Sequence, residues 1–237
     1  MTAPYSPPAF TALLFGLSGC LVDFGARSVP VALQRLYPDY RGEFTGLEQV
    51  LGRAATPQER QVYEQALVEA AGEHAEATPG ALAVLEHQHQ QQVPCAWLDE
   101  LPRDVSIGLS RALPAWVPAA SNQGCRPWPA PDACWQALRD VQADQLDGCV
   151  LISGEPRLLQ AGLKAGLWTI GLAACGPLCG QAPADWDALP AQERDQLRTQ
   201  ATLTLYRLGV HSVIDHLLDL DPCLADLAAR RQKGEKP

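Results

Sequence analysis

The fold class follows from one stretch of the sequence, Gly148-Cys-Val-Leu-Ile-Ser-Gly-Glu-Pro-Arg-Leu-Leu-Gln-Ala-Gly-Leu-Lys-Ala-Gly-Leu-Trp-Thr-Ile-Gly-Leu172. Residues 148–152 form a short apolar run that predicts a buried strand, residues 156–165 predict a helix, and residues 167–172 predict a second strand. Strands joined by a helix in this way form a right-handed crossover and lie parallel in one sheet. The sequence therefore predicts an α/β fold with a Rossmann-like parallel sheet.

The segment before this unit divides into a strand and a helical block. Residues 11–15 are apolar and end at Gly16, which predicts the first buried strand. A helix is predicted over residues 29–36. From residue 46 to 92 apolar residues recur at helical intervals, and Pro79-Gly80 divides this block into two long helices. We therefore expect a helical cap over 27–93 and an α/β core formed by 1–26 and 94–237.

The remaining predicted elements complete the core. They are a strand over 115–120, a helix over 131–141, a long polar helix over 185–208, a short strand over 212–214 and a last helix to about residue 230. Ligands of open parallel sheets bind beyond the carboxyl ends of the strands. This rule predicts one pocket surrounded by residues 16–20, 121–125 and 153–156.

Composition narrows the classes of partner. A hydrophobic fraction of 47% with 19% charged residues is typical of a folded globular protein. The net charge of −9 and the absence of a Lys/Arg cluster argue against nucleic acid. No apolar run approaches the roughly 20 residues of a membrane-spanning helix. Met1 to Pro8 lacks a basic start followed by an apolar run, which predicts a cytoplasmic protein with reduced thiols.

Three segments resemble one known superfamily. Phe15-Gly-Leu-Ser-Gly-Cys-Leu-Val-Asp-Phe-Gly25 resembles the first motif of the haloacid dehalogenase (HAD) superfamily, in the version found in phosphonoacetaldehyde hydrolases. Ala161-Gly-Leu-Lys-Ala-Gly-Leu-Trp-Thr-Ile-Gly171 is similar to the stretch that follows the acidic motif of that family, and residues 208–215 fit its ending. The resemblance spans nearly the whole chain. It implies a HAD core with an inserted helical cap, and a homodimer formed through the cap.

The resemblance also implies that the catalytic residues have been lost. The first Asp of the family is the nucleophile and a magnesium ligand, and Gly16 stands in its place. Cys20 replaces the threonine that contacts phosphate. The metal-binding aspartates fall on Gly154 and Leu158, with Glu155 one place away. Magnesium, which prefers carboxylate oxygens, therefore lacks its expected ligands, and we predict neither a metal site nor another cofactor.

A second loss concerns the lysine of the cap. Phosphonoacetaldehyde hydrolases use a cap lysine to form an imine with the aldehyde, so that the carbon–phosphorus bond can break. The sequence has no lysine between Met1 and Leu163. This predicts that the chain does not carry out the reaction of the family by the mechanism of the family.

Some pocket residues are retained by resemblance. Asp23 is kept, Ser121 and Asn122 match the second motif, and Arg126 matches the arginine of the third. The short interval from Ser121 to Arg126 suggests that a helix, and with it a strand, was deleted after the second motif. Two interpretations stay open: a residual anion site, to which the loop 16–20 presents N–H groups, or turns and helix caps with nothing bound. Ser18 and Cys20 are weak candidates for a new nucleophile, because no His is near in sequence.

Three hypotheses for function result. The first is a non-catalytic binding or regulatory protein that senses phosphate, a phosphonate or another small anion in the old pocket, or acts on a protein partner. The alternative is a residual or altered hydrolase in which Glu155, Asp23 or a cap residue takes a new role. The third is a structural interaction protein whose pocket is vestigial.

Overall fold

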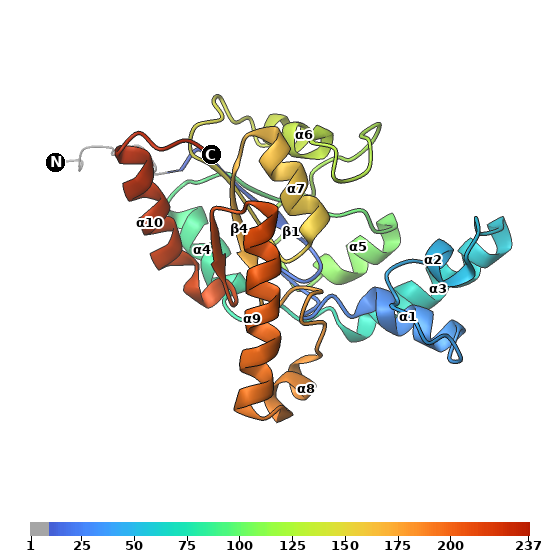
Figure 1. Ribbon diagram of the computed structural model, residues 1–237. Coiled ribbons are helices and arrows are strands. Elements are labelled where there is room, and N and C mark those ends of the chain that lie inside the picture. Colours follow the sequence, from blue (N-terminus) through green and yellow to red (C-terminus); the bar gives the residue numbers. More distant parts are fainter. Residues whose placement is uncertain (1–9) are drawn as a thin grey trace.

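A parallel five-stranded sheet forms the centre of the computed structural model, which describes residues 10–237 (Figure 1). The segment Met1 to Pro8, used above to predict the compartment, lies outside the described residues. The strand order is β2-β1-β3-β4-β5, and every pair is parallel. The strands are β1 (Ala12–Gly16), β2 (Cys95–Leu98), β3 (Cys149–Ser153), β4 (Trp168–Leu172) and β5 (Ser212–Ile214). The predicted fold class is confirmed.

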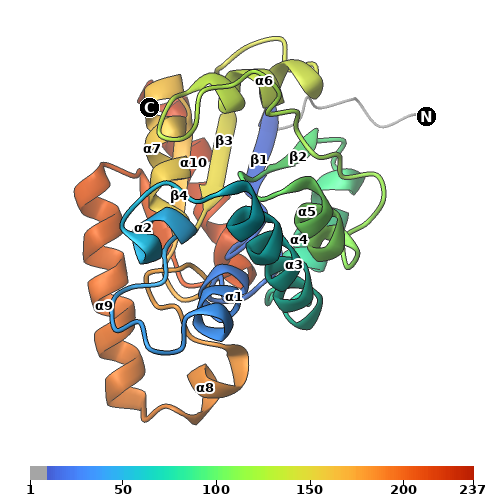
Figure 2. The ribbon, with the colours of Figure 1, turned by 90° about the vertical axis from the view of Figure 1, so that its right-hand side faces the viewer.

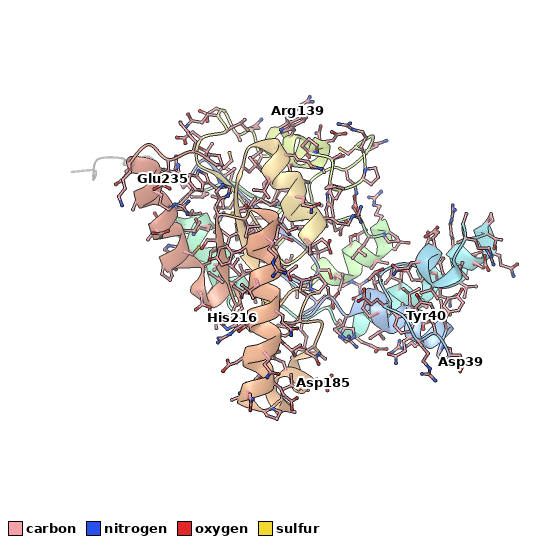
Figure 3. All side chains as sticks on the ribbon, viewed as in Figure 1. Asp39, Tyr40, Arg139, Asp185, His216 and Glu235 are labelled. Atoms are coloured by element: carbon pink, nitrogen blue, oxygen red, sulfur yellow. The ribbon has the colours of Figure 1, made fainter. Side chains whose placement is uncertain are left out.

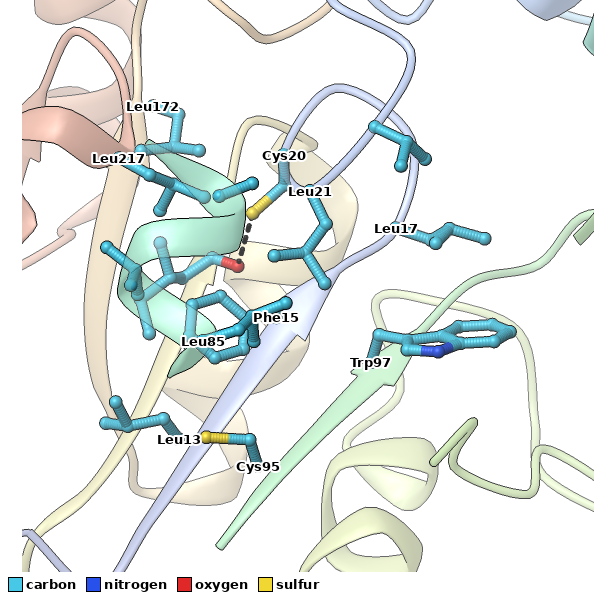
Figure 4. Packing of buried hydrophobic residues seen from close by; sticks show 14 of the residues in the cluster. Leu13, Phe15, Leu17, Cys20, Leu21, Leu85, Cys95, Trp97, Leu172 and Leu217 are labelled. Carbon is cyan, nitrogen blue, oxygen red and sulfur yellow. Dashed lines mark hydrogen bonds between the residues drawn. The ribbon is translucent and has the colours of Figure 1, made fainter. Parts of the chain in front are cut away.

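Helices cover both faces of the sheet, because the strands are apolar on both sides. Leu13 and Phe15 belong to the cluster on one face, and Leu14 belongs to the cluster on the other. The first face carries α4 (Ala81–Gln90), α5 (Arg103–Ser110), the short helix η1 (Leu217–Asp219) and α10 (Leu220–Gln232); the second carries α6 (Asp132–Asp140) and α7 (Pro156–Ala165). Figure 4 shows Leu13, Phe15 and Leu85 of α4 packed in the first cluster.

The sequence placed one strand wrongly. Residues 115–120 were predicted as a strand, but they form only an isolated bridge, between Ala119 and Trp97. The strand beside β1 is β2, and Gly16 of β1 is paired with Leu98 of β2. Because β2 has only four residues and follows directly on the helical block, its apolar run gave a weak signal. The helix α5 after it was also missed.

The predicted long helix over 185–208 is divided in two. The chain forms α8 (Pro183–Ala188) and α9 (Ala191–Leu208), separated at Pro190. Leu189 is extended, with φ −63° and ψ 140°, because proline disfavours helical geometry in the residue before it. The result is a pair of helices that projects beyond the sheet (Figure 1).

The cap consists of α1 (Ser28–Leu36), α2 (Leu47–Leu51) and α3 (Pro57–Glu73), which project to one side of the core (Figures 1 and 2). Thr56 and Glu59 form a capping box at the start of α3. Leu85 of α4 lies in the same buried cluster as Phe15 of β1, and Leu67 of α3 also belongs to this cluster. The predicted cap boundary at residue 93 stays a prediction.

No helix within residues 10–237 is both long enough and apolar enough to cross a lipid bilayer.

Candidate functional site

The crevice at the carboxyl ends of β1 and β3 is the place where the sequence predicted a pocket. The sheet continues to β2 on one side of β1 and to β3 on the other, so this is the topological switch point. A Cβ atom built on Gly16 would lie 2.6 Å from Oγ of Ser153, which is fully buried. The space that a side chain at position 16 would enter is therefore occupied by Ser153.

Gly154, at the second expected carboxylate position, is enclosed more tightly still. A Cβ atom there would lie 2.4 Å from Cα of Gly176 and 2.6 Å from the carbonyl oxygen of Gly19. These are backbone atoms of the loops that follow β4 and β1. Three loops thus meet backbone to backbone above the sheet, where a hydrolase would need room for a substrate. Leu158, the other expected metal position, is buried in the apolar cluster under α7.

The loop after β1 is held by Asp23. Its buried carboxylate accepts hydrogen bonds from Ser18 Oγ at 2.7 Å, from the backbone N–H of Arg27 at 2.8 Å and from that of Ser28 at 3.2 Å. Asp23 also has a positive φ of 56°, a conformation that Asp adopts more readily than most residues. Its side chain therefore fixes the loop to the start of α1, which is a structural task.

Three N–H groups of this loop donate to backbone carbonyls of the protein. Leu17 N–H donates to Leu98, Gly19 N–H to Val22 and Asp23, and Leu21 N–H to Leu17, in each case to a backbone carbonyl. The N–H groups of Leu17 and Gly19 are therefore not available to a bound anion. The interpretation of residues 16–20 as an anion cradle stays a prediction.

Cys20 is buried and inert. Burial raises the pKa of the Cys20 thiol well above its usual value, so the thiol stays protonated at neutral pH. Its Sγ is 3.4 Å from the carbonyl oxygen of Ile152, a contact marked in Figure 4. Ser18 donates its hydroxyl to Asp23, and no histidine accepts it. Neither side chain has the neighbours that an activated nucleophile requires.

The residues matched to the second and third motifs do not enter the crevice. Ser121 accepts from Gln123 N–H and its own N–H donates to Asp140, while Arg126 forms an ion pair with Asp132 at 2.7 Å and is 72% exposed. The side chain of Asn122 donates to the backbone carbonyl of Asp99 at 3.2 Å. These three residues follow the edge segment beyond β2, not the strand next to β1, so the placement of the second motif on Ser121 is wrong.

No deletion is needed to explain the chain between β2 and Arg126. Both α5 and the edge segment around Ala119 lie in this interval. The short spacing from Ser121 to Arg126 looked like a deletion only because the wrong strand was taken as the neighbour of β1. The sequence signal that could have corrected this was the run Cys95 to Leu98 followed by Asp99.

Two carboxyl groups do flank the crevice. Asp99 follows β2, and burial raises its pKa to about 6; its Oδ2 is buried without a hydrogen-bond partner among the described residues. Glu155 follows β3, and burial raises its pKa, although the N–H of Arg157 opposes the effect. Glu100 accepts from the N–H of Trp128 and pairs with Arg157 at 3.3 Å. The sequence predicted a place for Glu155 and missed Asp99.

Known proteins are similar to this chain in both sequence and fold. No protein-family model matches the chain. A phosphonoacetaldehyde hydrolase from Salmonella agona (strain SL483) is 36% identical over 137 residues, which cover 51% of this chain and 50% of that protein. The chain thus spans about half the length of the curated relatives it matches. One solved chain is 51% identical, with a TM-score of 0.77, over 96% of this chain and 100% of that one.

Two further structures agree in fold. The phosphonoacetaldehyde hydrolase like protein from Oleispira antarctica has a TM-score of 0.84 at 21% identity, over 100% of both chains. A HAD family hydrolase from Deinococcus radiodurans R1, solved with bound phosphate and sodium, has a TM-score of 0.62 at 22% identity, over 94% of this chain and 98% of that one. These similarities support a phosphonatase-like identity within the HAD superfamily, as the sequence resemblance predicted.

The magnesium ion of the HAD superfamily does not fit the residues present in the crevice. Two of the three positions that would supply carboxylates are glycines whose side-chain space is filled by Ser153 and by backbone, and the third is the buried Leu158. Within residues 10–237 no three His, Cys, Asp or Glu side chains are grouped so that they could hold a metal. Asp99 and Glu155 remain on either side of the crevice, with one of the loops that close it between them.

Proposed function

We propose that this chain is a non-catalytic member of the HAD superfamily that acts by binding and not by hydrolysis. The observation that carries the proposal is the closure of the crevice at Gly16 and Gly154. At Gly154 the obstructing atoms belong to the backbone of Gly19 and Gly176, and backbone moves less easily than a side chain. An aspartate side chain at this position has no room between these backbone atoms.

The position of the lysines supports the proposal. Lys164 lies in the last turn of α7, which begins beside the crevice at Pro156 and runs away from it for about 12 Å before it reaches this residue. Lys233 and Lys236 follow α10, and the charge of Lys236 acts on Asp147, just before β3 begins. All three lysines are thus at the opposite edge of the sheet, where they do not meet an aldehyde in the crevice.

The first experiment is a turnover assay. The purified chain is incubated with phosphonoacetaldehyde and with p-nitrophenyl phosphate, with and without magnesium, and borohydride is added to trap any imine. We expect release of phosphate at the background rate and no increase in mass after reduction. Metal-dependent turnover that disappears in Glu155→Gln or Asp99→Asn would overturn the proposal.

A second candidate is an altered hydrolase, which the raised pKa values of Asp99 and Glu155 favour. A carboxyl group whose pKa is raised toward neutral pH is suited to general acid catalysis. The same assay distinguishes the two, since an enzyme of this kind would lose activity as pH rises above the pKa of Asp99. Asp23 is a poor candidate for this role because its carboxylate is engaged in three hydrogen bonds.

The remaining expectations of assembly and location stay predictions. The homodimer through the cap is consistent with the exposed apolar side chains of Val62 and Val68 on α3. Sedimentation velocity of the chain, with Val62→Ser as the variant, tests it: we expect a dimer that the substitution weakens. A monomer at micromolar concentration would leave a protein partner as the occupant of this surface.

A further inference from the structure

A second hollow lies at the same edge of the sheet, beyond β4 and β5. It has a volume of about 270 Å³ and is enclosed by residues that follow these two strands and by side chains of α8 and α9. Figure 3 shows His216, which follows β5, beside α9, and Asp185 on α8. Since the crevice at β1 and β3 is closed, this hollow is an open site at the edge where α/β folds bind ligands. Its volume suits a ligand below drug size, because drug-sized ligands take pockets of roughly 300–1,000 Å³.

One cation in the lining of this hollow has no carboxylate to neutralise it. Arg198 donates to Asp215 at 2.9 Å and to Asp195 at 3.0 Å, so both aspartates of the lining share one guanidinium. The guanidinium of Arg194, one turn earlier on α9, has no hydrogen bond or ion pair with any described residue, although the backbone N–H of Arg194 donates to Pro190. A guanidinium keeps its charge at every accessible pH. The N–H donors of the Arg194 guanidinium are therefore available to a ligand in the hollow. The chain as a whole carries a net charge of −9.

Trp186 gives the hollow an apolar wall. It lies on α8 and its ring centroid is 6.4 Å from that of Phe24 in the loop after β1. That loop is tied to the residues after β4, since Gly25 N–H donates to the carbonyl of Cys175 at 2.7 Å. Trp186 thus packs against the loop after β1, which is tied to the loop after β4, and these two loops also close the crevice at β1 and β3.

We propose that this hollow binds a small organic anion, with its anionic group on Arg194 and an apolar part against Trp186. The inference rests on the proposed non-catalytic function. It places the binding site at the ends of β4 and β5 and not at the ends of β1 and β3. The charge-assisted contact with Arg194 gives the orientation, and the indole selects for a flat apolar group.

The test uses benzoate as the probe, with benzyl alcohol as its neutral counterpart and inorganic phosphate as an anion without an apolar part. Binding is followed by amide chemical shifts in NMR titrations of the full chain. We expect benzoate to shift the amides of Ala174 and His216, and to bind at least about tenfold more tightly than benzyl alcohol or phosphate.

Two variants on one helix provide the matched comparison. Arg194→Gln should weaken benzoate at least about tenfold, whereas Arg207→Gln, the same change in the last turn of α9 and outside the hollow, should leave it unchanged. Trp186→Leu should reduce the preference for benzoate over phosphate. Equal weakening by both arginine substitutions, or no binding of benzoate at millimolar concentration, would overturn the proposal.

The outcome is separable from that of the turnover assay. Turnover in the assay with benzoate bound at Arg194 would overturn the non-catalytic function and keep the site. Background rates with no benzoate binding would keep the non-catalytic function and remove the site.

Discussion

Two regions at one edge of the sheet differ in what fills them. At the ends of β1 and β3 the space is filled by Ser153 and by glycine backbones, whereas beyond β4 and β5 it is bordered by charged side chains. At the first region the positions that the resemblance assigns to carboxylates are glycines with no room for a side chain. Under the proposed function, the comparison teaches that binding takes place at a different part of the same edge.

The largest expected effect is at Gly154. Gly154→Ala adds a Cβ atom 2.4 Å from Cα of Gly176, so we expect the free energy of unfolding to fall by about 3 kcal/mol or more. Gly72→Ala in α3, where a Cβ atom meets nothing within 4 Å, is the control and should stabilise by about 0.5–1 kcal/mol. Urea denaturation measures both. A crevice that tolerates Gly154→Ala without loss would be open, and the contrast between the two regions would disappear.

The carboxyl group of Asp99, beside the closed crevice, should make the stability of the chain depend on pH. Burial raises the pKa of Asp99 to about 6 from an unfolded value of about 3.9. Between these values the folded chain binds more protons, so the contribution of Asp99 to stability falls as pH rises from about 4 to about 6. Relative to the wild type, Asp99→Asn should gain up to about 3 kcal/mol between pH 4 and pH 7.

Denaturation at both pH values, with Glu155→Gln in parallel, checks the sign. Burial raises the pKa of Glu155 as well, so its variant should shift in the same direction. A variant whose stability relative to the wild type is the same at pH 4 and pH 7 would show that Asp99 is solvated, and hence that the crevice admits water.

A smaller effect is expected at the loop that joins crevice and cap. Asp23→Ala removes the acceptor of the N–H groups of Arg27 and Ser28 and should lower the unfolding free energy by about 2 kcal/mol. Asp23→Asn keeps an acceptor oxygen and tolerates the positive φ, so it should cost less. Limited proteolysis at α1 should follow the same order. Equal costs for the two variants would indicate that the charge, and not the capping, is what matters.

No measurable effect is expected at Arg126. Its side chain is 72% exposed, and neither region includes it. Arg126→Gln should therefore change neither the denaturation midpoint nor the binding of benzoate. Any loss of anion binding in this variant would return Arg126 to a binding site and contradict its placement here.

The local part of the fold was predictable from the sequence, and the pairing of strands was not. The strands β1, β3 and β4 and the helix α7 were predicted because each is a continuous apolar or amphipathic run between clear breaks. The strand β2 was missed, and residues 115–120 were chosen in its place, because both are short apolar segments. Which of them lies against β1 depends on packing between residues about 80 positions apart in the sequence, as in the pairing of Gly16 with Leu98.

The sequence by itself determined the α/β class, the glycines at positions 16 and 154, and the absence of lysine before Lys164. These are properties of residue identity and local periodicity, which no tertiary contact alters. Only the tertiary structure decided that Ser153 and Gly176 fill the space beside those glycines, that Ser121 and Arg126 lie outside, and that Arg194 faces a hollow. The physical reason is that side-chain space and unpaired charge are set by segments far apart in the chain, which are brought together only when the sheet has formed.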